Sequence, residues 1–410
     1  MPDTYSISGA TIVTVNGPEQ NSSVEIKGKR LSRIGGISAN DLRLDPGMIL
    51  FPALINIHDH LRGTYSPRVG PPAGVYYLKC SNWEQDLRSS DVVKERSNLS
   101  EEDCYYLGGY KNLLSGVVTV NDHFPHEINE RFIPLLPLRV IGNYTLAHEA
   151  TSHSLDWGEG IELEHAKAKK KNYPFIIHLE EGFDEEYQRG IELLEKLGSL
   201  DKYDILIHCL GFSEADIEKT RNLGCTVAWC PASNFFMFNV TCKIRKILTA
   251  GINCAIGTDS VATGSINLLE EIRFARRMYK KMYGEVLEGR RIFDMVTINP
   301  ARAFRMEKDI GSIEVGKLAD LLVIRPSHPD PYEALVETRI EDIELMVWEG
   351  KPVYGARSLG KFFDLDPKEY TDIRIKGREK FVKGDPAGLL RRIQEKIGYK
   401  KVFDFIPLDD

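Results

Sequence analysis

Two histidines separated by one residue, His58 and His60, follow an apolar run that covers residues 48–55. Successive side chains of a strand point to opposite faces, so these two imidazoles lie on the same side of an extended strand end. Two imidazoles placed in this way can bind one metal ion. In a chain with ten histidines the pair could equally be two polar residues that leave the core, so the metal hypothesis depends on further ligands elsewhere.

Titratable side chains follow three other apolar runs in the same way. The runs are residues 174–177, followed by His178 and then Glu181; residues 204–207, followed by His208; and residues 252–256, followed closely by Asp259. Any one of these groups has an ordinary explanation, as a hydrogen-bonded strand-edge residue or as part of a turn. Four strand ends with such groups, counting the first pair, favour one shared site.

The elements that would position these groups are strands that alternate with helices. Apolar runs and helical patterns take turns along residues 52–306, which indicates a parallel sheet with crossover helices. A (β/α)8-type barrel of the α/β class is the leading prediction, and an open doubly wound sheet is the second. Active sites of such barrels lie at the carboxyl ends of the strands, where the polar groups stand.

Seven barrel strands can be recognised in the sequence where eight are expected. Their apolar runs end at Ile57, Val120, Tyr144, Ile177, Ile207, Ala228 and Ile256. The eighth strand is therefore missing, very short, or hidden within residues 148–158. We expect a barrel that is distorted in this region.

Both ends of the chain are rich in short strand patterns separated by glycine turns. We predict that residues 1–51 and 307–356 pair into one small β-sandwich domain, and that residues 52–306 form the metal-binding barrel. Residues 357–410 are predicted to be a C-terminal extension that packs on the small domain or lies at a subunit interface.

Composition excludes several classes of function. The net charge of −7 argues against a nucleic-acid-binding surface, and the basic run at residues 167–171 reads as a solvated helix end. No apolar stretch is long enough to span a membrane, and the first residues lack the pattern of a secretion signal. The seven cysteines show no Cys-x-x-Cys spacing, so we expect a reduced, cytoplasmic protein.

Taken in chain order, these motifs resemble the amidohydrolase superfamily over nearly the whole chain. The resemblance rests on His58-Asp59-His60, His178 with Glu181, His208, Cys230-Pro231-Ala232-Ser233-Asn234, Gly257-Thr258-Asp259, Thr297-Ile298-Asn299-Pro300-Ala301-Arg302-Ala303, and residues 311–322. The branch that the chain most resembles contains cytosine, guanine, adenosylhomocysteine and triazine deaminases or hydrolases. The resemblance implies one divalent metal ion per chain, either zinc or iron.

Carried over residue by residue, the resemblance implies a role for each group at the strand ends. The implied metal ligands are His58, His60, His178 and Asp259; Glu181 would be the proton shuttle, and His208 a metal-site or substrate-polarising histidine. Three imidazoles and a carboxylate suit zinc or ferrous iron better than magnesium or calcium. Asp259 could also accept a proton from the attacking water. No lysine stands at a strand end to bridge two metals, which favours one.

The residues that contact the substrate are harder to identify from the sequence than the metal ligands. Deaminases of this branch carry a substrate-contacting histidine on the strand before the one that bears the third ligand histidine. His148 and His153 lie in the segment where that strand is expected, although each could be a loop residue. His123 follows the strand that ends at Val120, and it could line the pocket or support His58 or His60.

The long loop at residues 61–88 is a second source of substrate contacts. Arg62 or Arg68 could bind an anionic group, and Trp83 could stack on a ring. The alternative is an ordinary lid with surface arginines. Asn234, in the segment that follows the strand ending at Ala228, is predicted to belong to the pocket wall.

These observations predict a metal-dependent hydrolase that acts on a non-peptide carbon–nitrogen bond. The leading hypothesis is hydrolytic deamination of a cyclic amidine or amino-heterocycle, a small-molecule substrate. The alternative is hydrolysis of a cyclic amide or amide, as in imidazolonepropionase or an amidase. A third hypothesis, a non-catalytic structural relative, is weakened because all the implied ligands are present. A homo-oligomer is possible.

Overall fold

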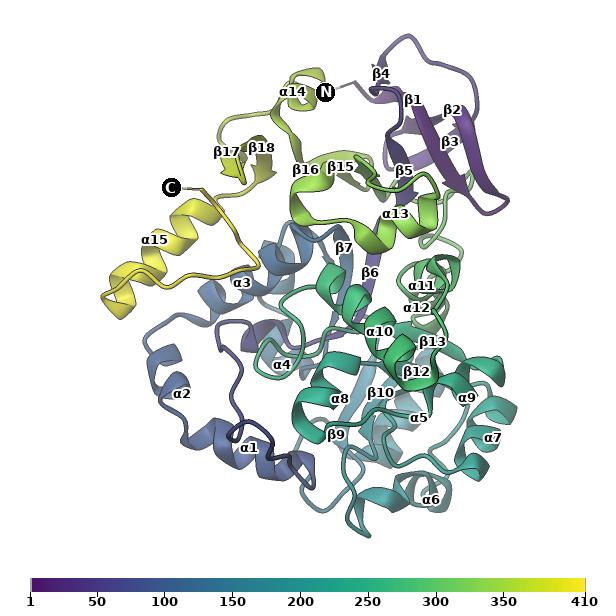
Figure 1. The fold of residues 1–410 in the computed structure, drawn as a ribbon, viewed down its shortest axis with the longest axis vertical. Helices are drawn as coiled ribbons and strands as arrows, with labels where there is room; N and C mark the ends of the chain where they lie inside the picture. Colours follow the sequence, from purple (N-terminus) through teal and green to yellow (C-terminus); the bar gives the residue numbers. More distant parts are fainter. Residues whose placement is uncertain (1, 410) are drawn as a thin grey trace.

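The computed structural model describes residues 2–409 of the chain (Figure 1). Within that range, eight strands lie in two parallel sheets whose orders are β6-β7-β8 and β13-β12-β11-β10-β9. Their bounds are β6 Leu54–Asp59, β7 Val117–Asp122, β8 Arg139–Val140, β9 Thr145–Glu149, β10 Phe175–Leu179, β11 Asp204–His208, β12 Thr226–Trp229 and β13 Asn253–Ile256. The predicted α/β class with parallel strands is confirmed.

The eighth barrel strand, which could not be recognised in the sequence, lies between β7 and β10. A single strand ending at Tyr144 was expected, and this expectation is wrong: β8 ends at Val140, and β9 begins at Thr145 directly after Tyr144. No helix separates the two strands in this part of the described chain. Because β8 has only two residues, it shows no recognisable strand pattern of its own. In the sequence, β8 and β9 therefore look like one apolar run.

The parallel strands are buried on both faces, which explains their continuous apolar runs. In β10, Phe175, Ile177 and Leu179 belong to one buried apolar cluster. Ile176, whose side chain points to the opposite face, belongs to another. A polar residue at the end of such a strand therefore leaves an apolar layer and enters the space above it.

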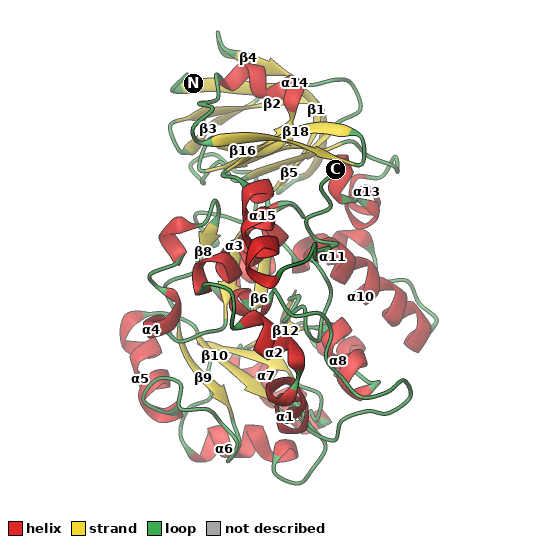
Figure 2. Cartoon of the chain, turned by 90° about the vertical axis from the view of Figure 1, so that its left-hand side faces the viewer, coloured by secondary structure: helices red, strands yellow, loops and turns green. Residues whose placement is uncertain are grey.

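Helices connect these strands and cover them (Figure 2). Their bounds are α1 Cys80–Ser89, α2 Asp91–Arg96, α3 Glu101–Leu113, α4 His126–Asn129, α5 Ile161–Lys171, α6 Gly190–Lys196, α7 Glu214–Leu223, α8 Pro231–Phe238, α9 Ile244–Thr249, α10 Leu268–Tyr283, α11 Gly289–Met295 and α12 Ile298–Ala303. Among residues 2–409, no helix is both long enough and apolar enough to cross a membrane.

Both chain ends meet in one further sheet of ten strands in the described structure, drawn in purple and green at the top of Figure 1. Its strands are β1 Thr4–Thr14, β2 Gly17–Lys27, β3 Arg30–Ile34, β4 Asp41–Arg43, β5 Ile49–Pro52, β14 Leu321–Ile324, β15 Ile343–Trp348, β16 Lys351–Ala356, β17 Tyr370–Ile375 and β18 Arg378–Lys383. Leu50 of β5 pairs with Val323 of β14, which joins the two ends. The β-sandwich and the domain boundaries stay predictions.

The last sixty residues contact two parts of the molecule. β17 and β18 extend the ten-stranded sheet, whereas α15, Pro386–Ile397, lies beside α3 (Figures 1 and 2). There Arg392 donates a hydrogen bond to Asp103 of α3 at 3.1 Å. Two shorter helices also belong to the C-terminal part of the chain: α13, Pro331–Glu337, precedes these sixty residues, and α14, Arg357–Gly360, lies among them.

Candidate metal centre

Three imidazoles and one carboxylate meet at the carboxyl ends of the parallel strands. His58 Nε2 lies 3.5 Å and His60 Nε2 lies 3.4 Å from Asp259 Oδ1. His58 Nε2 also lies 3.4 Å from His178 Nε2. The structure thus brings together the four residues that the sequence suggested as ligands.

The backbone explains why Asp259, which follows β13, reaches the histidines at the end of β6. Asp259 has a positive φ of 56°, a left-handed conformation that aspartate tolerates better than most residues. Its N–H donates a hydrogen bond to the His58 carbonyl at 3.1 Å. Ser233 Oγ donates to Asp259 Oδ2 at 2.6 Å, so Oδ2 is occupied and Oδ1 faces the imidazoles.

The donor atoms fit a divalent metal ion. Ligands that bind zinc at 2.0–2.1 Å in a tetrahedron lie about 3.4 Å apart, and the three separations here are 3.4–3.5 Å. Burial and the neighbouring charge of His58 lower the pKa of His60 to about 3. Burial, followed by the charge of His123, also holds the pKa of His178 well below its usual range. These shifts favour the neutral forms of His60 and His178, the form in which a histidine binds a metal ion.

Glu181 and His208 face the same space from β10 and β11. His208 Nδ1 donates to the amide oxygen of Asn234 at 2.8 Å, which leaves Nε2 unprotonated. This Nε2 lies 3.4 Å from Glu181 Oε1. Burial and the charge of Asp259 raise the pKa of Glu181 well above its usual value, which favours the protonated form of this carboxyl group. A buried carboxylic acid beside a metal-ligand cluster can donate and accept a proton.

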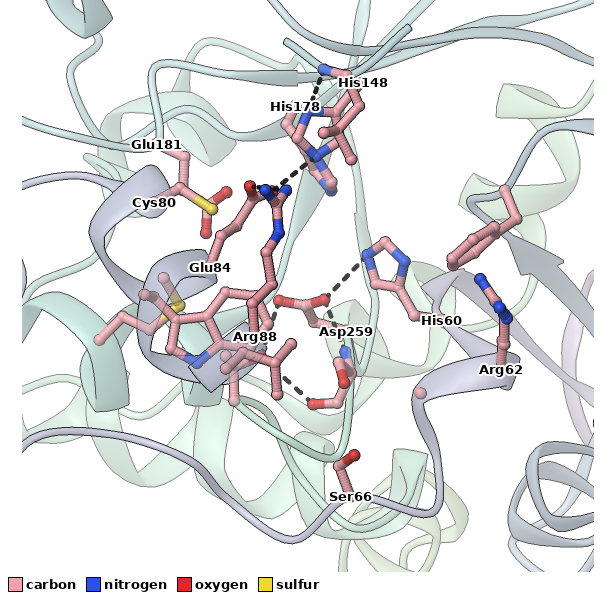
Figure 3. A pocket seen from close by; sticks show the side chains of 18 of the residues that line it. His60, Arg62, Ser66, Cys80, Glu84, Arg88, His148, His178, Glu181 and Asp259 are labelled. Atoms are coloured by element: carbon pink, nitrogen blue, oxygen red, sulfur yellow. Dashed lines mark hydrogen bonds and ion pairs between the residues drawn. The ribbon is translucent and has the colours of Figure 1, made fainter. Parts of the chain in front are cut away.

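A cavity of about 310 Å³ opens next to these groups. In Figure 3, Asp259, His60, His178 and Glu181 surround its inner end. Its apolar wall is formed by Trp83, Leu87, Val93, Phe124, Leu155, Trp157 and Met237. An apolar pocket with a few convergent polar groups at one end is the usual form of a small-molecule site.

The structure places His148 and His153, the two candidates for a substrate-contacting histidine, in different surroundings. His148 lies in β9, is buried, and lines the cavity. Its Nδ1 accepts a hydrogen bond from the Leu155 N–H at 3.2 Å, so Nε2 carries the proton and lies 3.2 Å from Glu84 Oε1. His153 lies outside the cavity, in contact with Lys79 Nζ at 3.1 Å.

The loop residues also divide into two groups. Trp83 of α1 lines the cavity and donates its indole N–H to the Val69 carbonyl at 3.0 Å. Arg62 lies at the cavity edge, where its Nη2 donates to Glu101 Oε1 at 2.9 Å. Arg68 donates to the Gly264 carbonyl at 2.9 Å and does not line this cavity.

His123 and Asn234 are not among the cavity residues. Asn234 holds His208 instead, and its own amide N–H donates to Thr241 Oγ1 at 3.0 Å, which fixes the amide orientation. His123 is fully buried behind the cavity, with its ring against that of His178.

Sequence reasoning missed several cavity residues. Glu84, Arg88, Arg96 and Trp157 all line the cavity. Arginine and glutamate are common on lid helices, so nothing in their spacing marks them. The signal that could have found Glu84 is its position directly after Trp83, in a loop already expected to cover the site.

A buried ion pair supports the strand that carries the first two histidines. Asp59 lies between them in sequence, and its Oδ1 accepts a hydrogen bond from Lys111 Nζ at 2.7 Å; both side chains are fully buried. The amide N–H groups of Asn56 and Asn112 donate to Asp59 Oδ2 at 3.2 and 2.7 Å. The carboxylate between the histidines thus anchors β6 to α3 and has no free oxygen for a metal.

Comparison with known proteins gives consistent results. Residues 139–366 match the model of the amidohydrolase family. Two similar proteins are both named 5-methylthioadenosine/S-adenosylhomocysteine deaminase. The one from Caldicellulosiruptor saccharolyticus is 32% identical over 78% of this chain and 84% of its own length. The one from Thermoanaerobacter pseudethanolicus is 24% identical over 86% of this chain and 93% of its own length.

Two solved structures share the fold. An adenosine deaminase from Xanthomonas campestris with bound zinc superimposes with a TM-score of 0.74 at 18% identity, covering 95% of this chain and 97% of that one. Atrazine chlorohydrolase from Arthrobacter aurescens, complexed with zinc, gives a TM-score of 0.70 at 19% identity, over 85% and 94% of the two chains. At these identities the similarity shows the fold alone.

Proposed function

Because the chain belongs to the amidohydrolase family, we propose that it removes the exocyclic amino group of an amino-heterocycle by hydrolysis with one bound divalent metal ion. The observation that carries this proposal is the close approach of the donor atoms of His58, His60, His178 and Asp259, three pairs of which lie 3.4–3.5 Å apart beside an apolar cavity. Glu181 and His208 stand beside them; burial raises the pKa of Glu181 and lowers that of His208 to about 4, which favours the neutral form of each side chain.

In this proposal the four donors hold one zinc or iron ion. When bound, such an ion lowers the pKa of a coordinated water to about 7 and so supplies a nucleophile at neutral pH. The Asp259 carboxylate would accept a proton from the water, while its Oδ1 faces the ligand cluster and accepts a hydrogen bond from the Ser260 N–H at 2.6 Å. Ser233 keeps the other oxygen of this carboxylate occupied and its orientation fixed.

Glu181 and His208 act on the substrate side. Glu181 enters the reaction as an acid and donates a proton to a ring nitrogen next to the carbon that is attacked. His208 Nε2 lies beside Glu181, and the hydrogen bond to Asn234 fixes its ring. With Nε2 unprotonated, the imidazole accepts a hydrogen bond from the hydroxyl group that is added to the ring carbon. A carbon–oxygen bond forms, the carbon–nitrogen bond breaks, and ammonia leaves with a proton returned from the carboxyl groups.

We propose an aminopurine nucleoside as the substrate class. The relatives above carry names that refer to adenosine derivatives, and Trp83, Phe124 and Trp157 give the cavity flat aromatic walls. His148 and Glu84 form a linked polar pair in the same wall, 3.2 Å apart. This pair can bind the polar edge of a ring or a sugar hydroxyl.

The proposal includes the architecture that the sequence predicted. Residues 52–306 form a distorted (β/α)8 barrel, and residues 1–51 with 307–356 form the small domain. The hydrogen bond between the Asp259 N–H and the His58 carbonyl supports closure, since it joins the ends of the first and last strands. An open doubly wound sheet would keep these strands apart.

Product analysis tests the proposal. The metal-loaded protein is incubated with adenosine, 5-methylthioadenosine, S-adenosylhomocysteine, guanine and an aminotriazine, together with cyclic amides as a comparison set. Release of ammonia with gain of a ring carbonyl is the expected result. A product with a new carboxylate from a cyclic amide, and none from the amino-heterocycles, would replace the deaminase by an amide hydrolase.

A further inference from the structure

A fourth imidazole, that of His123, faces the cluster of His58, His60 and His178. His123 follows β7, the strand beside β6, and it is fully buried. Its ring centroid lies 4.5 Å from that of His178 and 5.3 Å from that of His58. Because it does not line the cavity, a role in substrate contact does not explain this position.

A hydrogen bond fixes the tautomer of His123. Its Nε2 lies 3.2 Å from the Ala147 carbonyl oxygen. A carbonyl only accepts hydrogen bonds, so Nε2 carries the proton. A histidine that binds a metal ion is neutral, so this proton is the only one on the ring nitrogens. The lone pair of Nδ1 therefore points away from Ala147.

This lone pair faces His178. His123 Nδ1 lies 3.3 Å from His178 Nε2, the same atom that lies 3.4 Å from His58 Nε2. When His178 Nε2 serves as a metal ligand it has no proton to donate. Two lone pairs would then face each other at 3.3 Å, which is unfavourable unless both point at one cation. Ligand atoms of all four histidines lie within 4.8 Å of one another.

We infer that His123 Nδ1 is a fifth protein ligand of the metal, in addition to His58, His60, His178 and Asp259. The inference rests on the proposed metal centre and goes beyond it, because it adds an imidazole to the expected ligand set. The Ala147 carbonyl then plays the part of the outer hydrogen-bond partner that orients a ligand histidine. Five donors exceed the four that zinc usually takes, so the site favours an ion of higher coordination number, such as ferrous iron.

X-ray absorption spectroscopy of the metal-loaded wild-type protein tests the inference directly, without any variant. Imidazole rings give a recognisable scattering pattern, and their number per metal ion can be fitted. Four imidazoles are expected if His123 is a ligand. Three imidazoles would overturn the inference while leaving the proposed function intact. A protein that binds no metal would overturn the proposed function itself, so the two failures are distinguishable.

Variants supply a second readout through the dissociation constant of the metal, measured by competition with a chelator. His123→Phe keeps a ring of similar shape and removes both nitrogens, and we expect a loss of affinity of at least about tenfold with one imidazole fewer in the spectrum. His126→Phe is the matched control, because His126 Nε2 also bonds a carbonyl, that of Tyr144 at 3.0 Å, and His126 belongs to none of the three groups of possible metal ligands found among the described residues.

His123→Asn guards against a folding defect of the phenylalanine variant. Its amide oxygen can take a place near that of Nδ1, so we expect three imidazoles and an affinity between those of the wild type and His123→Phe. Unchanged metal affinity and an unchanged imidazole count in His123→Phe would show that His123 is not a ligand.

Discussion

Strand β11 carries a histidine–carboxylate cluster at each end, and the two clusters behave differently. At its last residue, His208 joins the ligand cluster around Asp259. At its first residue, Asp204 Oδ1 lies 3.3 Å from Nε2 of His165, a residue of α5. Asp201 Oδ1 also lies 3.4 Å from this nitrogen. Both clusters contain three or more groups that can bind a metal ion.

The difference lies in the partners that each cluster already has. Asp201 pairs with Lys169 at 3.0 Å and accepts a hydrogen bond from the Tyr203 N–H at 2.9 Å. Burial is the largest single effect and acts to lower the pKa of His165, but the hydrogen bond to Asp204 and the charges of Asp204 and Asp201 together outweigh it and leave the pKa raised. This cluster is therefore neutralised by its own protons and cations. The cluster at the other strand end has several neutral imidazoles and one carboxylate, which leaves lone pairs for a metal. Donor type alone does not define a metal site.

The largest effect is expected from replacing Glu181, the acid at the carboxyl ends of the parallel strands. Glu181→Gln keeps the side-chain shape and removes the proton that can be donated, so kcat should fall by about 10²- to 10⁴-fold with metal content unchanged. Asp201→Asn, at the other end, is the control and should leave kcat as it is. Steady-state kinetics with metal analysis of the same samples checks this. Equal losses of kcat in Glu181→Gln and Asp201→Asn would contradict a functional difference between the two clusters.

The second effect concerns the stability that the buried ion pair of Lys111 and Asp59 gives to the carboxyl end of β6. Lys111→Met leaves the buried Asp59 carboxylate without its cation, and we expect the free energy of unfolding to fall by about 3–5 kcal/mol. Chemical denaturation followed by circular dichroism measures it. Lys111→Met combined with Asp59→Asn should recover part of the loss, because no charge is then left buried. A loss below about 1 kcal/mol for the single variant would mean that water reaches Asp59.

The third effect is a pH dependence at the opposite end. The pKa of His165 is raised in the folded protein above its usual value of 6.5. Its stabilising contribution is therefore complete below pH 6.5 and is lost as the pH rises through the raised pKa. Wild type should exceed His165→Gln in stability by about 1–3 kcal/mol at low pH, and the gap should close at high pH. A difference in stability between wild type and His165→Gln that increases with pH would contradict this prediction.

The smallest effect is expected from the exposed ion pair of the same cluster. Lys169 is half exposed, 52% of its side chain, and pairs of this kind contribute about 0.2–1 kcal/mol. Lys169→Met should therefore change the free energy of unfolding several times less than Lys111→Met. Thermal unfolding of the two variants side by side decides this point, and a large loss in Lys169→Met would contradict the ranking.

The sequence signals at the carboxyl ends of the parallel strands are local, which is why the candidate site there could be predicted. An apolar run that ends in His178 or Asp259 defines both the strand and the side chain that leaves it. The parallel architecture then brings the strand ends together. The α/β class follows from this pattern, whereas the choice of four ligands among the strand-end groups came from the resemblance to the amidohydrolase superfamily.

Other features depend on contacts between distant residues, which a pattern does not contain. Lys111 and Asp59 are 52 residues apart, and neither stands in a motif that points to the other. His148 and His153 differ only in whether a short strand reaches them. The direction of the His123 ring is set by the Ala147 carbonyl on another strand, so its relation to the ligand cluster appears only in three dimensions.

Metal content per chain, measured by elemental analysis, tests the central claim most directly. The wild type and His165→Gln should each retain one zinc or iron ion per chain, whereas His178→Ala and Asp259→Asn should retain little. Full metal content in both ligand variants, or loss of the metal in His165→Gln alone, would contradict the assignment of the metal centre to the carboxyl ends of the strands.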